Sequence, residues 1–194
     1  MLKTTHWPEK IMGWLLVAGL GFTACTAHAA AGEHAVYPTA TEEKGAAKIA
    51  IAGIVLGTGM AEVRQYFAGK GLKPSSKTET ILQYDKIPGA RVRAKNIRLY
   101  FFNKKLYKVA ITHSEEERDG YDVYHKVKAE LVAWYGDDFE VLGDDAATVE
   151  AVAWRALHDD MIDLELMFQA VGKITTAAYI YKPLYKEFLA SFMQ

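Results

Sequence analysis

The chain has 194 residues, enough for one compact domain or two small ones. Hydrophobic residues make up 51% of the chain and charged residues 24%, which is the composition of a globular protein and excludes a largely disordered one. The formal net charge is only −1, but the charges of opposite sign are separated along the chain.

The first 29 residues have the organisation of a bacterial export signal. Lys3 and Lys10 precede an apolar run over 11–22, and small residues follow as far as Ala29. The apolar run, about twelve residues long, is too short to span a bilayer comfortably. We therefore interpret 1–29 as a cleaved signal rather than a permanent anchor, and we expect an exported, periplasmic protein.

Two ways of processing this signal remain open. Ala27-His28-Ala29 fits the small-x-small rule for ordinary cleavage. Phe22-Thr23-Ala24-Cys25 resembles a bacterial lipobox, in which Cys25 would be lipidated and would anchor the protein to a membrane. Cys25 is the only cysteine, so on either interpretation the folded part contains no disulfide.

The start of the folded part is marked by a change in composition. Residues 30–47 are small, polar and aperiodic, which predicts a flexible linker before a single globular domain over 48–194. A strand is expected over 49–56, and five glycines fall within 53–72. A nucleotide-binding loop is excluded there, because Glu62 occupies the position where a Rossmann fingerprint needs glycine, and Lys70 is not followed by Ser or Thr.

The glycines instead bracket a short helix. Thr58 or Gly59 is suited to the N-cap, and Gly69 or Gly71 to the C-terminal end. The apolar side chains that repeat on one face are those of Met60, Val63 and Phe67.

Three strands are predicted after this helix, over 80–85, 97–102 and 106–112. The last two are joined at Asn103-Lys104-Lys105, which favours a tight hairpin. Alternation places Ile97, Leu99 and Phe101 on one face of their strand, and Tyr107, Val109 and Ile111 on one face of the partner strand.

The second half repeats this order of elements. A helix is predicted from an N-cap at Asp119 to Gly136, with one apolar face formed by Tyr124, Val127, Leu131 and Trp134. Strands are predicted over 150–157, 161–169 and 174–181, and a terminal helical turn after Pro183. The expected fold class is α+β: tandem helix-plus-three-strand units over about 48–112 and 113–194, forming an antiparallel sheet with helices packed on one face.

Three segments carry a resemblance to known proteins: GIVLGTGMAEV over 53–63, LYFFNKKLYKV over 99–109 and LVAWYG over 131–136. They resemble segments of small exported bacterial domains related to the β-lactamase inhibitor protein and to the small lipoprotein of the outer-membrane β-barrel assembly machinery. The resemblance covers about half of the mature chain. It implies the fold and a role in binding other proteins, and it implies no catalytic residue. The true inhibitors carry disulfides that this chain lacks.

The two halves carry opposite charge. Residues 45–112 contain nine Lys and four Arg against three acidic residues, a net charge of +10. Residues 113–194 contain five Lys and two Arg against seventeen acidic residues, a net charge of −10. Either the halves neutralise each other, or a basic face meets an acidic partner. The residues of that basic face would be Lys86, Arg91, Arg93, Lys95, Arg98, Lys104, Lys105 and Lys108.

Aromatic side chains are predicted beside these cations. Tyr100 and Phe102 alternate with the core residues Leu99 and Phe101, and they are exposed if the sheet has one solvent-facing side. Aromatic and arginine side chains are typical of interface hot spots. The predicted partner-binding residues are Arg91, Arg93, Arg98, Tyr100, Phe102, Lys104, Lys105 and Tyr107. The alternative is that the segment from Leu184 to Phe192 covers the same aromatic residues.

No catalytic, metal-binding or cofactor-binding pattern is found. His113 precedes a charged loop, His125 lies on the polar face of a helix, and His158-Asp159-Asp160 is typical of a turn. The acidic stretch over 137–145 lacks the spacing of an EF-hand.

The sequence therefore predicts a non-enzymatic, exported cell-envelope module that binds a protein or an anionic envelope surface through its sheet, with no nucleic acid as partner. The alternative is a periplasmic protein that binds a lipid or small ligand in a pocket between the halves.

Overall fold

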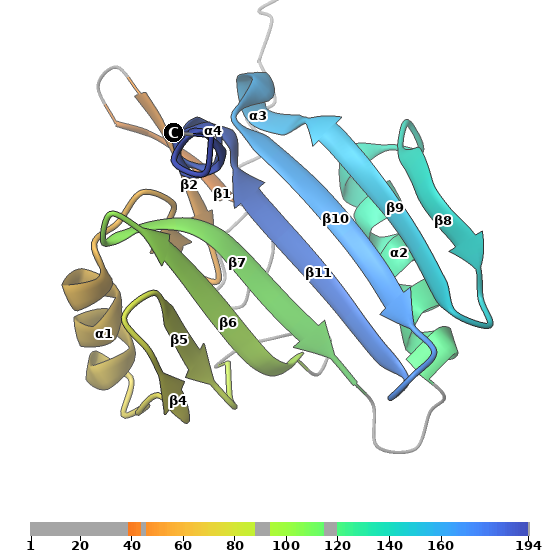
Figure 1. Ribbon diagram of the computed structural model, residues 1–194, viewed down its shortest axis with the longest axis horizontal. Helices are drawn as coiled ribbons and strands as arrows, with labels where there is room; N and C mark the ends of the chain where they lie inside the picture. The colour runs from red at the N-terminus through yellow and green to blue at the C-terminus, as the bar shows by residue number, and fades with distance from the viewer. Residues whose placement is uncertain (1–38, 44–45, 88–93, 115–119, 194) are drawn as a thin grey trace, which may run out of the picture. The chain divides into compact units, whose positions relative to one another are not determined.

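The computed structural model describes residues 39–43, 46–87, 94–114 and 120–193. The predicted export signal and Cys25 lie outside these residues. The described part contains a small antiparallel sheet near the N-terminus and a large one that follows it (Figure 1). The strands of the small sheet, in spatial order, are β1 (Thr39–Glu43), β2 (Ala46–Ile51) and β3 (Ile54–Val55).

The large sheet has eight antiparallel strands in the order β4-β5-β6-β7-β11-β10-β9-β8. The first half of the chain contributes β4 (Ser76–Lys77), β5 (Ile81–Tyr84), β6 (Ala94–Phe102) and β7 (Lys105–His113). The second half contributes β8 (Glu140–Asp145), β9 (Val149–Ala156), β10 (Ile162–Gln169) and β11 (Ile174–Tyr181). The halves join edge to edge, because β7 pairs with β11 from His113 opposite Thr175 to Lys108 opposite Ile180.

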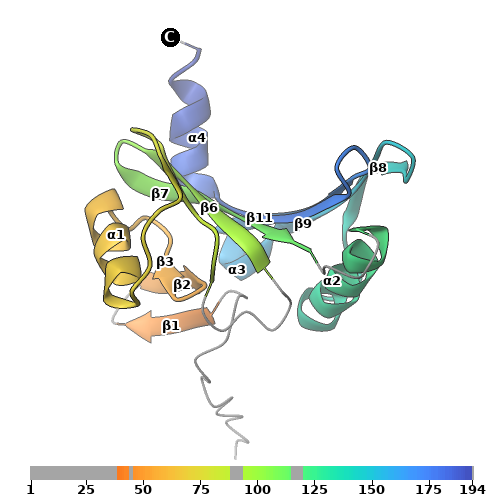
Figure 2. The same ribbon diagram turned by 90° about the horizontal axis from the view of Figure 1, so that it is seen from below.

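The helices lie on both faces of the large sheet. Helices α1 (Met60–Gly69) and α2 (Gly120–Tyr135) and the small sheet lie on one face, and α4 (Lys182–Ala190) stands on the other (Figure 2). The short segment α3 (Leu157–Asp160) is a left-handed turn between β9 and β10, in which His158 and Asp159 have positive φ. The α+β class with an antiparallel sheet is confirmed, but α4 departs from the prediction that the helices share one face.

Helix α1 forms as its sequence predicts. Gly59 is the N-cap, and Val63 and Phe67 are buried against the sheet. The ring of Phe67 stacks on that of Tyr84 in β5, with the ring centroids 3.9 Å apart. Beyond the helix, Gly71 has a φ of +74°, and the backbone N–H of Leu72 donates to the Phe67 carbonyl oxygen at 2.9 Å.

Helix α2 covers β10 and β11 from the same side. Its buried side chains are those of Val123, Tyr124, Val127 and Leu131. The prediction that Trp134 belongs to the same buried face is wrong, because its side chain is 60% exposed. At its start, the Thr175 hydroxyl of β11 donates to the Gly120 carbonyl oxygen at 2.9 Å. At its end, Gly136 has a φ of +82°, as expected for the residue that terminates a helix. The predicted N-cap Asp119 lies outside the described residues.

The β6–β7 hairpin contains one feature that alternation did not predict. Asn103 and Lys104 have φ of 48° and 63°, which makes the predicted tight turn. Tyr100 pairs with Lys108 and Phe101 with Leu106, so Tyr107 is an extra residue on its strand, a β-bulge. The bulge turns Tyr107 to the face opposite Val109 and Ile111, and the prediction that these three side chains share a face is wrong.

Two further predictions need correction. Part of the linker predicted over 30–47 forms β1 and the beginning of β2, which pair with each other. The second half contributes four strands to the sheet rather than three, because β8 pairs along β9. Among the described residues, no helix is both long and apolar enough to cross a membrane.

Candidate functional site: the open face of the sheet

We call the face opposite α1 and α2 the open face. One row of directly paired residues crosses it from β5 to β8: Gln83, Arg98, Ala110, Ala178, Glu165, Ala153 and Glu140. Alanines occupy the middle of this row, and charged side chains stand on both sides of them. The side chains of the row are therefore short at its centre. The charge of the row changes from basic to acidic across the junction of β7 and β11.

The basic side of the open face belongs to the first half. Arg98 is exposed, and its Nε and Nη2 atoms donate to Oε1 of Gln83 at 3.2 and 3.0 Å. The Lys108 ammonium lies 5.6 Å from the centre of the Tyr100 ring, a cation–π contact. Lys105 lies opposite Phe102 at the end of the hairpin. One carboxylate, Asp85, follows β5 and accepts a hydrogen bond from Ser75 at 2.7 Å.

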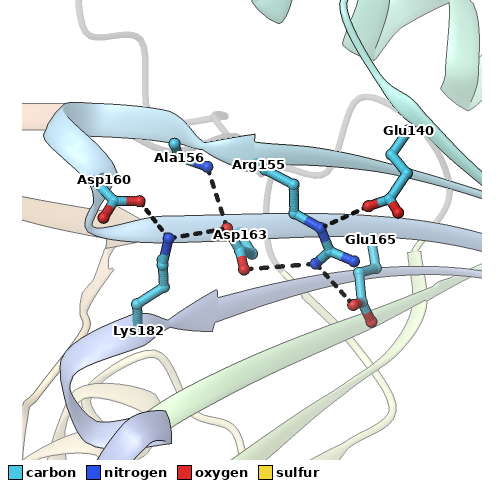
Figure 3. Close-up of polar contacts among 7 residues, drawn as sticks. All are labelled: Glu140, Arg155, Ala156, Asp160, Asp163, Glu165 and Lys182. Carbon is cyan, nitrogen blue, oxygen red and sulfur yellow. Dashed lines mark hydrogen bonds and ion pairs between the residues drawn. The ribbon is translucent and has the colours of Figure 1, made fainter.

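The acidic side belongs to the second half and is built around Arg155 of β9 (Figure 3). The guanidinium lies 3.3 Å from a Glu140 oxygen, 3.4 Å from an Asp163 oxygen and 3.1 Å from a Glu165 oxygen. Burial lowers the pKa of Arg155, but the hydrogen bonds that it donates to Glu165 and Glu140, with the charges of Glu165 and Asp163, outweigh this effect and the net shift is upward. The three carboxylates come from β8 and β10, the two strands that flank β9, so the register of the sheet brings them together around Arg155.

A second cation, Lys182, joins the same group at the start of α4. Its ammonium contacts Asp160 and lies 3.7 Å from Asp163. The hydrogen bond from Lys182 lowers the pKa of Asp160, and the same bond raises the pKa of Lys182. We call Glu140, Arg155, Asp160, Asp163, Glu165 and Lys182 the acidic cluster. It holds four carboxylates against two cations and therefore keeps an excess of negative charge.

Helix α4 covers one end of the open face with aromatic contacts. The Phe188 ring centroid lies 5.0 Å from that of Tyr107 and 5.6 Å from that of Phe102, and Tyr185 stacks on Tyr107 at 6.1 Å. The helix then leads away from the sheet (Figure 2). Its last apolar side chains are exposed, with exposed fractions of 46% for Leu189, 72% for Phe192 and 87% for Met193.

The structure brings most of the predicted partner-binding residues onto the open face. Arg98, Lys104 and Lys105 are exposed, and Tyr100 is half-buried. Tyr107 is buried beneath α4, and Phe102 is partly covered by it, as in the alternative in which the C-terminal segment covers them. Arg91 and Arg93 lie outside the described residues.

Sequence analysis missed the acidic cluster. Asp163 and Glu165 fall within the strand predicted over 161–169, but their contact with Arg155 depends on the pairing of β9 with β10. The contacts named above for Arg155 and Lys182 stay within the second half, and that of Arg98 stays within the first. These contacts therefore do not join the basic side of the open face to the acidic side, and the two sides lie next to each other on the sheet.

The histidines singled out from the sequence lie apart from this face or at its edge. His113 is 4% exposed and belongs to the core side of β7, and burial lowers its pKa to about 4. His158 lies in the left-handed turn, and exposed His125 contacts the ring of Tyr121 on α2. Among the described residues, no group of His, Cys, Asp and Glu has an arrangement suited to a metal ion.

Comparison of the chain with protein-family models, with curated proteins and with solved structures gives no match.

Proposed function

We propose that this protein is a non-enzymatic, exported cell-envelope module that binds a protein partner through the open face of its large sheet. One observation carries the proposal: in the part of the chain that the structure describes, helices and the small sheet cover one face, whereas on the other face α4 covers only the end near Tyr107 (Figure 2). The rest of that face holds the charge gradient from Arg98 to the acidic cluster.

The composition of the open face suits recognition of a protein surface. Arginine and tyrosine are over-represented at interface hot spots, and Arg98 and Tyr100 are both accessible. Opposite charges on the two sides of one face favour a single orientation of a partner that carries the reversed arrangement. Such binding is expected to weaken at high salt, because exposed charges are screened beyond about 8–10 Å.

The tandem arrangement of the fold fits this function. We infer that the two halves are structural repeats, each a helix followed by four strands, since the strand order is symmetric about the junction of β7 and β11. The alternative function, a ligand pocket between the halves, has less support because the halves are joined there by paired strands.

Site-specific photo-crosslinking of the full chain in cells tests the proposal. A photo-reactive phenylalanine analogue is placed at Arg98 or Thr176 on the open face. The control positions for the same analogue are Ala61 and Gln65, which are exposed on α1, on the opposite face of the sheet. We expect a discrete adduct from the open-face positions alone, identified by mass spectrometry.

A charge test separates specific recognition from simple proximity. Arg98→Glu with Lys108→Glu is compared with Arg64→Glu with Lys73→Glu, which makes the same change in net charge at exposed positions away from the open face. With the analogue at Thr176, which both pairs of substitutions leave in place, the adduct should be lost only with the first pair. Equal adducts from open-face and α1 positions, or equal loss with both pairs, would argue against a binding face.

A further inference from the structure

We propose that the partner of the open face is a second copy of this chain, and that the end of α4 from each copy seats on β9 and β10 of the other. This inference rests on the proposed function, because it names the occupant of the same face. It follows from two features of one chain that match each other, an exposed apolar end and an apolar floor, and that lie apart within that chain.

The first feature is the end of α4. Leu189 near the end of α4 is exposed, as are Phe192 and Met193 just after the helix. Lys186 is an exposed cation one turn before Leu189, and the exposed carboxylate of Glu187 follows it. The ring of Phe192 contacts the protein through Phe188, with the centroids 4.9 Å apart. An apolar helix end with a flanking cation has the chemistry to bind an apolar surface edged by carboxylates.

The second feature is the part of the open face formed by β9 and β10. Met167 lies directly opposite Ala151, and Glu165 opposite Ala153, which in turn pairs with Glu140. Val149, two residues before Ala151 and on the same face, is 37% exposed. Ala151 and Ala153 are only 5% and 1% exposed, so Val149 and Met167 supply the accessible apolar surface of this floor, and the carboxylates of the acidic cluster lie along its side.

The apolar end of the C-terminal segment and the floor lie apart within one molecule, although Lys186 is close enough to Asp160 to help lower the pKa of that carboxyl. Helix α4 begins beside the Asp163 end of β10 and leads away from the sheet (Figure 2), whereas Met167 lies four residues farther along β10, about 13 Å away. A two-fold axis between two copies brings each helix end to the floor of the other copy, so that the same contact forms twice. Lys186 then faces Glu165 of the second copy.

The first experiment measures the mass of the purified protein by sedimentation equilibrium over a range of concentration. We expect a dimer that dissociates on dilution and at high salt. Phe192→Asp should weaken the dimer about tenfold or more, since a charge replaces an apolar side chain in the contact. Ala61→Asp is the control, because it adds the same charge at an exposed position of α1, on the opposite face of the sheet from both features.

A charge exchange identifies the contact itself. Lys186→Glu alone and Glu165→Lys alone should each weaken the dimer, because each places like charges together in both copies of the contact. An equimolar mixture of the two variants should associate again, since both contacts then join opposite charges. A folding defect in either variant would not be repaired by mixing.

The outcomes are decisive for this inference and distinct from those of the proposed function. A wild-type chain of single-chain mass at every concentration overturns the second-copy proposal, even where photo-crosslinking identifies another envelope protein on the open face. A dimer that is unaffected by Phe192→Asp, or is not restored in the mixture, overturns the assigned contact. Restoration by mixing, with an intact dimer in Ala61→Asp, supports it.

Discussion

Trp154 of β9 donates a hydrogen bond from its indole Nε1 to the carbonyl oxygen of Gly136, the residue that follows α2, at 2.9 Å. The side chain is 1% exposed, and its ring lies 5.3 Å from that of Phe139, which precedes β8. The side chain of Trp154 therefore holds both the end of α2 and the segment before the edge strand β8 against the core. The contact explains how the segment between α2 and β8 is positioned.

Replacing this indole tests the importance of that contact. Trp154→Phe keeps an aromatic ring but leaves the Gly136 carbonyl oxygen without its donor, so we expect the free energy of unfolding to fall by about 1–3 kcal/mol. Urea unfolding followed by far-UV circular dichroism measures the change. A loss below about 0.5 kcal/mol would mean that the hydrogen bond and the fit of the ring matter little.

Two glycines at helix ends should respond oppositely to the same substitution. A Cβ at Gly120 would lie 2.2 Å from the backbone oxygen of Lys173, whereas a Cβ at Gly69 meets nothing within 4 Å. We expect Gly120→Ala to destabilise the protein by about 1–3 kcal/mol, because the backbone at Gly120 or Lys173 must move to make room for the added Cβ. Gly69→Ala should be neutral or stabilising by up to about 1 kcal/mol. Thermal melting of the two variants side by side gives the comparison, and similar melting temperatures would contradict the packing at Gly120.

Acid should destabilise the protein through His113. Its folded-state pKa is lowered to about 4, against about 6.5 in the unfolded chain. Between these values the unfolded chain binds more protons, so the stability present above pH 6.5 is lost as the pH falls towards 4, by up to about 3 kcal/mol. His113→Gln should remove this part of the pH dependence, measured by urea unfolding at several pH values. The control His125→Gln, at an exposed position, should retain this pH dependence. If the two variants show the same dependence of the free energy of unfolding on pH, burial of His113 is excluded as the cause.

The two phenylalanines of the C-terminal segment should differ in their effect on the single chain. Phe188 packs on Tyr107 and Phe102, so Phe188→Ala should cost about 1–3 kcal/mol of stability and loosen α4. Phe192 is 72% exposed, so Phe192→Ala should change the stability of the dilute protein by less than about 0.5 kcal/mol. Thermal unfolding at low protein concentration measures both. Equal losses would mean that Phe192 also packs against the same chain.

The elements that sequence analysis predicted well are those in which local chemistry and burial agree. Helix α1 is bounded by glycines and has one buried face, and the β6–β7 turn contains Asn103 at positive φ. The strand β8 was missed because every one of its residues except Gly143 is exposed, so its sequence has no apolar alternation. It forms an edge strand through its pairing with β9.

The candidate site was predictable only in part, for a related reason. The cations and aromatics near the hairpin are close in sequence, and Arg98, Tyr100 and Lys105 do share the open face. The bulge turns the side chain of Tyr107 to the other face of the sheet, and the alternation of apolar and polar residues does not show where a strand has an extra residue. The acidic cluster joins residues from β8, β9, β10 and α4, so it depends on strand register rather than on any local motif.

The junction between β7 and β11 also bears on how the chain folds. The residues paired there are 62 to 72 positions apart in sequence, from Thr175 with His113 to Ile180 with Lys108. Within each half, neighbouring strands follow one another along the chain, so their hairpins close over short loops. The long-range pairing must pay a larger loop-closure entropy, and such pairings slow folding. We therefore expect the rate of folding to depend on the meeting of these two strands, after the local hairpins have formed on each side.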